Sequence, residues 1–109
     1  MRKVIIESPY AGNIERNVRY ARSCVMDSLL RGESPLASHL LYTQDGMLND
    51  DIPEQRKIGI GAGLNWLDVA ELHVFYIDLG VSDGMREAAK KSQKLGIKVE
   101  FRRLYDVDF

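Results

Sequence analysis

Residues 78–84, Asp-Leu-Gly-Val-Ser-Asp-Gly, hold the strongest candidate for a ligand site in the sequence. They lie between an apolar run and a helical pattern, and the first backbone N–H groups of a helix have no partner within it. Together with the helix dipole, these groups favour a bound anion such as phosphate. Ser82 and Gly84 are placed to donate hydrogen bonds to this anion. Met85, the next residue, is also a candidate ligand-binding residue. In the plainer alternative, Ser82 only caps the helix and Gly84 only eases the turn.

A second candidate segment is Ser-Pro-Tyr-Ala-Gly-Asn at residues 8–13. It offers the hydroxyl of Ser8, the aromatic face of Tyr10 and a conformationally permissive Gly12, with Asn13 beside them. Such groups suit stacking on, or hydrogen bonding to, a nucleoside. The alternative is a tight loop in which Tyr10 only covers the edge of the core. Because loops in this position usually carry function, both interpretations stay open.

Asp78 is a candidate general acid, because it ends an apolar strand and partial burial raises the pKa of a carboxyl group. Its alternative role is to accept hydrogen bonds from the backbone of the following turn. His39 is a candidate ligand contact, whereas His73 lies within a strand and is expected to be packed. The glycines of residues 59–63 lack the spacing of a dinucleotide motif, so we expect them to let a helix approach the sheet closely.

The elements that must position these residues follow from hydrophobic periodicity and from turn residues. Asn13 is expected to cap the first long helix, and Asp51 with Glu54 resembles a capping box for the second. The expected strands cover residues 2–7, 34–38, 72–78 and 97–101, and the expected helices cover residues 14–31, 53–68 and 82–95, with a short helical turn after residue 38.

This alternation of strands and helices predicts an α/β fold with a parallel sheet of about four strands and right-handed crossovers. The most apolar strands, the first and the third, belong at the centre, which gives the order 2-1-3-4 in a three-layer α/β/α domain. A crevice then opens at their carboxyl ends, between residues 8–13 and 78–84. The length of 109 residues suits a single domain over residues 1–109.

Composition narrows the classes of partner. Fifteen basic and sixteen acidic side chains give a formal net charge of -1, which argues against a nucleic acid polymer as partner. A lone Cys24 and two histidines provide no recognisable metal-ligand spacing, so we expect no metal and a reducing compartment. No apolar stretch approaches the length of a membrane span or a signal peptide. We therefore expect a cytoplasmic protein without membrane contact, acting on a small molecule and needing no cofactor.

Three stretches together resemble an uncharacterised phage and prophage family, which is itself similar to the nucleoside 2-deoxyribosyltransferase superfamily. They are residues 8–12, 35–42 and 76–85. The resemblance implies a small Rossmann-like sheet that binds nucleosides or nucleoside monophosphates and acts on the N-glycosidic bond through a glutamate. In that superfamily a Ser-x-Gly-x-x-x-Glu pattern binds phosphate and supplies the nucleophile. Ser82 and Gly84 match it, but Ala88 stands at the glutamate position, and the nearest acid is Glu87.

One residue along a helix rotates a side chain by about 100°, so we expect Glu87 to leave the inner face that Ala88 shares. Its alternative role is an exposed ion pair with Lys91. The sequence thus predicts a nucleotide- or nucleoside-binding domain, with cleavage or exchange of the glycosidic bond through Asp78 or Glu87. The rival hypotheses are a non-catalytic sensor or sequestering protein, and an interaction module with a vestigial crevice. Analogy with related small folds suggests a homodimer.

Overall fold

A computed structural model describes residues 1–105, and the last four residues of the predicted domain lie outside the described part. Its centre is a parallel sheet of β1 (Lys3–Glu7), β2 (Ser34–Leu36), β3 (Leu72–Tyr76) and β4 (Val99–Arg102). The strands lie in the order β2-β1-β3-β4, which confirms the predicted order 2-1-3-4. The α/β fold follows from it.

The two central strands carry the core because apolar side chains cover both of their faces. Their register pairs Val4 with Leu72 and Glu7 with Phe75. Alternate residues of a strand point to opposite faces, so Val4 and Ile6 belong to one face and Glu7 to the other. On the first face, Val4 and Ile6 pack in one buried cluster with Tyr20. The second face carries the candidate site.

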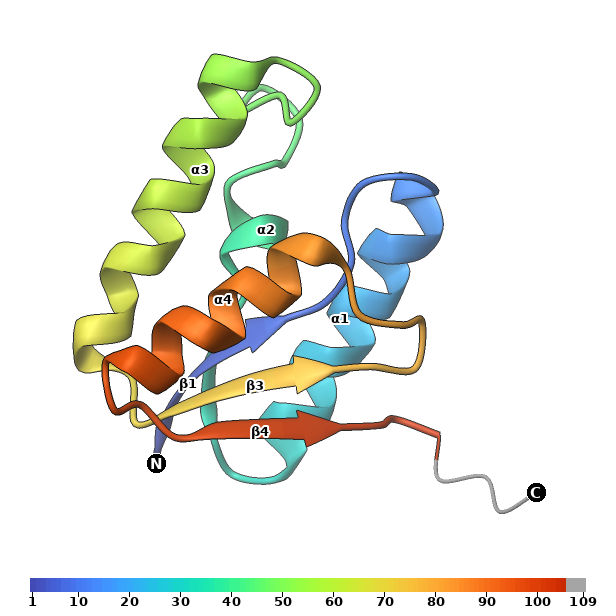
Figure 1. The fold of residues 1–109 in the computed structure, drawn as a ribbon. Helices are drawn as coiled ribbons and strands as arrows, with labels where there is room; N and C mark the ends of the chain where they lie inside the picture. The colour runs from blue at the N-terminus through green and yellow to red at the C-terminus, as the bar shows by residue number, and fades with distance from the viewer. Residues whose placement is uncertain (106–109) are drawn as a thin grey trace.

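Helices cover the two faces of the sheet (Figure 1), with α1 (Ile14–Leu30) behind it and α4 (Asp83–Lys94) in front. Asn13 caps α1 as predicted, because its side chain accepts a hydrogen bond from the N–H of Arg16 at 3.2 Å. Ser82 caps α4 in the same way, accepting from the N–H of Met85 at 3.2 Å. Both caps fix the point at which the chain leaves a loop above the sheet and enters a helix.

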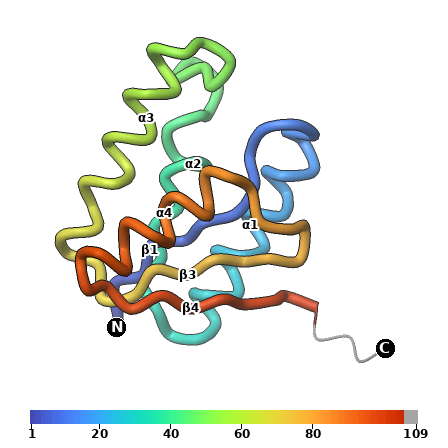
Figure 2. The backbone as a smooth tube through the Cα atoms, viewed as in Figure 1, coloured from blue at the N-terminus to red at the C-terminus, as the bar shows by residue number. Residues whose placement is uncertain are grey.

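The segment between β2 and β3 contains α2 (Ser38–Leu41), α3 (Pro53–Asn65) and a short 3-10 helix, η1 (Trp66–Val69). The predicted capping box of Asp51 and Glu54 is wrong, because Ile52 is the N-cap and makes no side-chain hydrogen bond. The side chain of Gln55 instead bonds the N–H of Asn49 at 2.7 Å, back in the preceding loop. The backbone trace in Figure 2 shows α3 leaning away from the sheet.

The sequence predicted that the glycines of α3 let this helix approach the sheet closely, but their neighbours lie elsewhere. A side-chain carbon added at Gly63 would lie 2.9 Å from the Cβ of Ser38 and still closer to its hydroxyl, so this glycine lets α3 approach α2. At Gly59 the nearest atom would be Cδ1 of Leu48, at 3.3 Å. Small residues therefore hold α3 against α2 and its following loop, beside the sheet. No helix among residues 1–105 has the length and apolarity needed to span a membrane.

Candidate functional site

A cavity of about 590 Å³ opens at the carboxyl end of β1, between α3 and α4. The loop after β1, helix α2, the inner side of α3 and the first turns of α4 line it. It therefore lies at the predicted position, where the chain leaves the central strands in opposite directions. Seven of the predicted site residues line it: Ser8, Tyr10, His39, Ser82, Gly84, Met85 and Glu87. Gly12, Asn13 and Asp78 are not part of the lining.

Ser8 and His39 form a hydrogen-bonded pair in the wall of the cavity. Ser8 directly follows β1, His39 lies in α2, and 2.6 Å separates the serine Oγ from the histidine Nε2. Burial lowers the pKa of His39, an effect that the charge of nearby Glu7 partly offsets. The other ring nitrogen, Nδ1, is buried without a hydrogen-bond partner among the described residues. The imidazole is thus neutral near pH 7, and its tautomer decides whether Ser8 donates or accepts.

The rest of the loop after β1 is held by Asn17 of α1, whose side-chain amide donates to the carbonyl oxygens of Tyr10 at 2.8 Å and Ala11 at 3.1 Å. This buried amide presents Tyr10 to the cavity. Gly12 adopts a φ of 100°, which side chains rarely tolerate, and so makes the turn into α1. Gly12 and the cap Asn13 shape the loop without lining the cavity.

The first turn of α4 lines the cavity with residues whose backbone N–H groups are free. The hydroxyl oxygen of Ser82 accepts from the N–H of Met85, and the sulfur of Met85 accepts from the N–H of Ser82 at 3.5 Å. Within residues 1–105, the N–H groups of Asp83 and Gly84 then have no acceptor, as expected for the start of a helix. The capping role of Ser82 and the exposure of these donors are compatible, because its O–H hydrogen remains available to a ligand.

Asp78 accepts hydrogen bonds from three residues in two distant segments of the chain. Its carboxylate accepts from the hydroxyl of Tyr20 and from the backbone N–H groups of Leu104 and Tyr105. Burial alone would raise the pKa of Asp78, but these hydrogen bonds together lower it. An acid held in its ionised form is poorly suited to donate a proton, and the arrangement matches the alternative role of accepting backbone hydrogen bonds.

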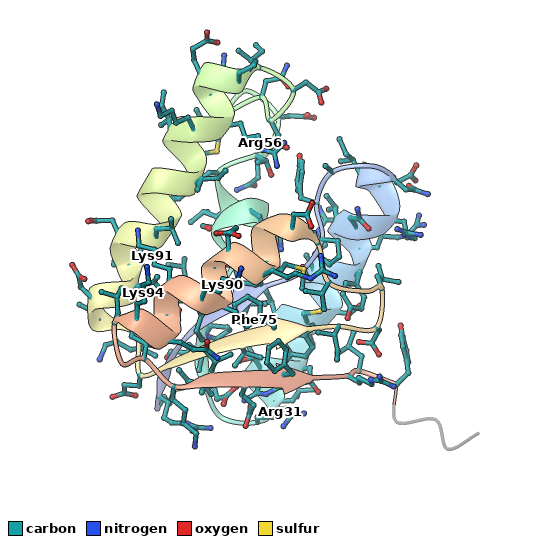
Figure 3. The ribbon with its side chains drawn as sticks, in the orientation of Figure 1. Arg31, Arg56, Phe75, Lys90, Lys91 and Lys94 are labelled. Carbon is teal, nitrogen blue, oxygen red and sulfur yellow. The ribbon has the colours of Figure 1, made fainter. Side chains whose placement is uncertain are left out.

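Glu87 and Ala88 both line the cavity, although the sequence suggested that only Ala88 would face inward. The side chain of Glu87 is 76% exposed and lies 3.7 Å from Nζ of Lys90, not of Lys91 as expected. Lys91 lines the cavity itself, as does Arg56 of α3. Figure 3 labels both of these cations, Lys91 on α4 and Arg56 on α3. Neither has an acidic partner within 4.0 Å among the described side chains.

Sequence reasoning missed Glu7, the last residue of β1, which also lines the cavity. Its Oε1 lies 3.1 Å from Nε2 of the fully buried His73. The second ring nitrogen of His73, Nδ1, lies 2.5 Å from the hydroxyl of Ser92 in α4. The signal was present, because an acid at the end of a buried apolar strand is the same pattern that singled out Asp78. The partner His73, 66 positions away, could not be read from it.

Metal ligation finds no support in the described part of the chain, which contains no group of three or more His, Cys, Asp or Glu side chains able to hold an ion. The polar groups that line the cavity are hydroxyl, imidazole, carboxylate and backbone N–H groups, together with the cationic groups of Arg56 and Lys91. Such a set suits hydrogen bonding to a polar organic molecule with an anionic group.

Family comparison places residues 2–102 in the family described as "Domain of unknown function (DUF7768)". The chain belongs to this family. No curated protein matches the chain. Among solved structures, a 2-deoxyribosyltransferase from Bacillus psychrosaccharolyticus aligns with a TM-score of 0.64 at 17% sequence identity. The alignment covers 98% of this chain and 76% of the other. The family member described here therefore has a fold similar to that of a 2-deoxyribosyltransferase.

Proposed function

We propose that the cavity binds a nucleoside 5′-monophosphate, with the parent nucleoside as a weaker ligand. The observation that carries this proposal is the position of the cavity, at the carboxyl end of β1 and against the exposed donors of α4. Ligands of open α/β sheets bind at this edge, and phosphate groups bind at helix N-termini. The similar fold of a 2-deoxyribosyltransferase adds support for this class of ligand.

The lining assigns each part of the ligand to a group of matching chemistry. The N–H groups of Asp83 and Gly84, with the hydroxyl of Ser82, would hold the phosphate. The aromatic face of Tyr10 would stack on the base, and the Ser8–His39 pair would bond the sugar hydroxyls. The volume of about 590 Å³ falls in the usual range for small-molecule sites.

Arg56 and Lys91 would raise the local concentration of an anionic ligand. Both line the cavity and neither is paired with an acid in the described structure, so their charges act on the solvent-filled space. Charges of one sign at the wall of a cleft steer oppositely charged ligands toward it. This effect weakens with salt, because the Debye length falls to about 8 Å at physiological ionic strength.

Two activities are compatible with such a site. The domain either cleaves or exchanges the N-glycosidic bond, or it binds the nucleotide without turnover, as a sensor or sequestering protein. Ala88 at the position of the superfamily's glutamate favours the second, and a carboxylate elsewhere in the lining favours the first. Release of free base from a bound monophosphate separates them. The homodimer and the cytoplasmic location stay predictions.

The Gly84→Ala variant tests the phosphate assignment, because the added carbon would meet only Ser82 Oγ, at 3.9 Å, and would otherwise enter the cavity. We expect the melting temperature to be unchanged or slightly higher. We expect the Kd for monophosphates, measured by calorimetry, to rise at least tenfold, and the Kd for nucleosides to change less. That difference corresponds to about 1.4 kcal/mol or more.

The matched control is Gly61→Ala, which also adds a carbon to an exposed helical glycine but lies outside the cavity lining. Its affinities should equal those of the wild type. If Gly84→Ala binds monophosphates with the same affinity as the wild type, the phosphate does not bind at the N-terminus of α4. Absence of thermal stabilisation of the wild type by any nucleotide would remove the proposed function, since a ligand at 100 times its Kd stabilises by roughly 2.7 kcal/mol.

A further inference from the structure

Glu7 is the cavity carboxylate whose position the fold fixes most completely. It ends the central strand β1, its side chain is 21% exposed, and it borders the cavity. His73 holds Oε1 at 3.1 Å, whereas Oε2 has no hydrogen-bond partner among residues 1–105. One carboxylate oxygen is therefore anchored to the protein and the other is available to a ligand or a water molecule.

His73 and Ser92 occupy positions where the core would otherwise be apolar. Both side chains are 0% exposed, and His73 lies in the strand beside β1. Taking a polar group out of water costs free energy unless it is hydrogen-bonded, and here each ring nitrogen has one partner. A fully satisfied polar chain of this kind rigidifies the groups that it connects. The chain ends at the cavity, on Glu7.

The Ser92–His73 pair can accompany both protonation states of Glu7. When Glu7 is ionised, Nε2–H of His73 donates to it and the Ser92 hydroxyl donates to Nδ1. When Glu7 is protonated on Oε2, Oε1 still accepts from Nε2–H, and the Ser92 hydroxyl still donates to Nδ1. No atom of the chain loses its partner in either state. Such an arrangement suits a carboxylate that gains and loses a proton during each turnover.

We infer that Glu7 is the general base of this cavity, positioned by His73 and Ser92, and that it activates water against the N-glycosidic bond of the bound nucleotide. This inference rests on the proposed function. Oε2 of Glu7 takes a proton from water while the water oxygen bonds to C1′ of the sugar. The C1′–N bond breaks, and its electron pair stays on the base nitrogen, which takes a proton from solvent. Glu7 then returns its proton to solvent, so the products are sugar phosphate and free base.

The two acids suggested by the sequence are less suited to this role. Asp78 lies outside the lining and is committed to Tyr20, Leu104 and Tyr105. Glu87 lines the cavity, but it is 76% exposed and its ion pair with Lys90 spans 3.7 Å. A base acts through a fixed geometry, which a solvated side chain on an exposed ion pair does not provide.

The test compares Glu7→Gln with Glu87→Gln, because both remove one carboxylate from the same cavity and keep the shape of the side chain. Free base released from nucleoside 5′-monophosphates is measured by chromatography, and the Kd of each variant is measured separately by calorimetry. We expect Glu7→Gln to lower kcat by about 10²- to 10⁴-fold with its Kd within threefold of the wild type. Glu87→Gln should retain the wild-type rate, and thermal melts should show that both variants are folded.

The outcomes separate this inference from the proposed function. A wild type that binds monophosphates without releasing base overturns the role of Glu7 and leaves the binding function intact, as does full activity in Glu7→Gln. Loss of activity in Glu87→Gln alone transfers the role to that residue. A wild type that binds no nucleotide removes the proposed function, and this inference with it.

Ser92→Ala tests the positioning role, since Ser92 touches His73 and not the cavity. We expect the pH at which kcat is half-maximal to move by at least half a unit, with Kd unchanged, and Ser92→Thr to restore the wild-type profile. If Ser92→Ala lowers the melting temperature but leaves the pH profile of kcat unchanged, Ser92 and His73 only stabilise the fold. That outcome would contradict their role in positioning Glu7.

Discussion

Among single residues, Glu33 and Arg102 form the most deeply buried ion pair of the described structure. Each side chain is 4% exposed, and two guanidinium nitrogens of Arg102 lie 2.7 Å from the two carboxylate oxygens. Hydrogen bonds from Arg102 lower the pKa of Glu33 most, burial opposes them, and Ser28 and Arg2 add to the lowering, which brings the value to about 2. This pair lies apart from the cavity and serves stability.

The pH dependence of stability should report on this pair. The folded-state pKa of Glu33 is lowered from 4.5 to about 2, so its contribution is present above pH 4.5 and disappears as the pH falls toward 2. That shift corresponds to a loss on the order of 3 kcal/mol. Glu33→Gln should be destabilised by about 3 kcal/mol near neutral pH, because Arg102 stays buried and keeps only the partly exposed Glu100 as a counter-charge.

Urea unfolding of the wild type and Glu33→Gln between pH 7 and pH 2 measures both effects. The control is Glu15→Gln, which removes an exposed ion pair with Arg19 at 3.3 Å and should change stability by less than about 0.5 kcal/mol. If Glu33→Gln loses stability between pH 4.5 and 2 as steeply as the wild type, another carboxylate is responsible for the acid sensitivity.

The matched glycines of α3 give a prediction at the scale of elements. Gly61 has open space around an added carbon, whereas at Gly63 the carbon would lie 2.9 Å from the Cβ of Ser38. Gly61→Ala should stabilise the protein by up to about 1 kcal/mol through helix propensity. Gly63→Ala should destabilise it by about 1–3 kcal/mol, since α3 must move away from α2.

Chemical denaturation of the two variants, each compared with the wild type, measures these changes. Because α2 and α3 form two walls of the cavity, Gly63→Ala should also weaken nucleotide binding, and Gly61→Ala should not. Equal stabilisation by both substitutions would mean that α3 does not pack against α2 as closely as described.

The elements themselves were largely predictable, and the exceptions have local physical causes. Apolar periodicity predicts β1, β3 and β4, and side chains that bond the nearest free N–H predict the caps Asn13 and Ser82. The strand β2 follows from the alternation of strands and helices, and the strand order follows from placing the most apolar strands at the centre. The cap of α3 was mispredicted because the loop before it uses its polar side chains on itself: Asn49 accepts from the N–H of Asp51 at 3.0 Å. Helix-capping rules consider only the residues at the helix end. They do not predict that polar side chains of the preceding loop bond to the backbone of the loop instead of capping the helix.

The candidate site was predictable in position and less so in membership. The carboxyl ends of β1 and β3 follow from topology, and with them the loop after β1 and the first turn of α4. The partners of these residues depend on side chains far away in sequence, as in the contacts of Ser8 with His39 and of Glu7 with His73. Hydrophobic periodicity predicts which face of a strand or helix a residue lies on, whereas its hydrogen-bond partner depends on how distant elements pack in the fold.

For the whole molecule, Asp78 connects three distant parts of the chain, and its replacement is our last prediction. The carboxylate follows β3 and accepts from Tyr20 in α1 and from Leu104 and Tyr105 after β4. Asp78→Ala leaves these donors without their acceptor and should lower the free energy of unfolding by about 2–4 kcal/mol. Hydrogen exchange at the amides of Leu104 and Tyr105 should accelerate, while nucleotide affinity should stay within threefold of the wild type. Lost affinity or turnover with unchanged exchange would instead make Asp78 a residue of the site, as the sequence first suggested.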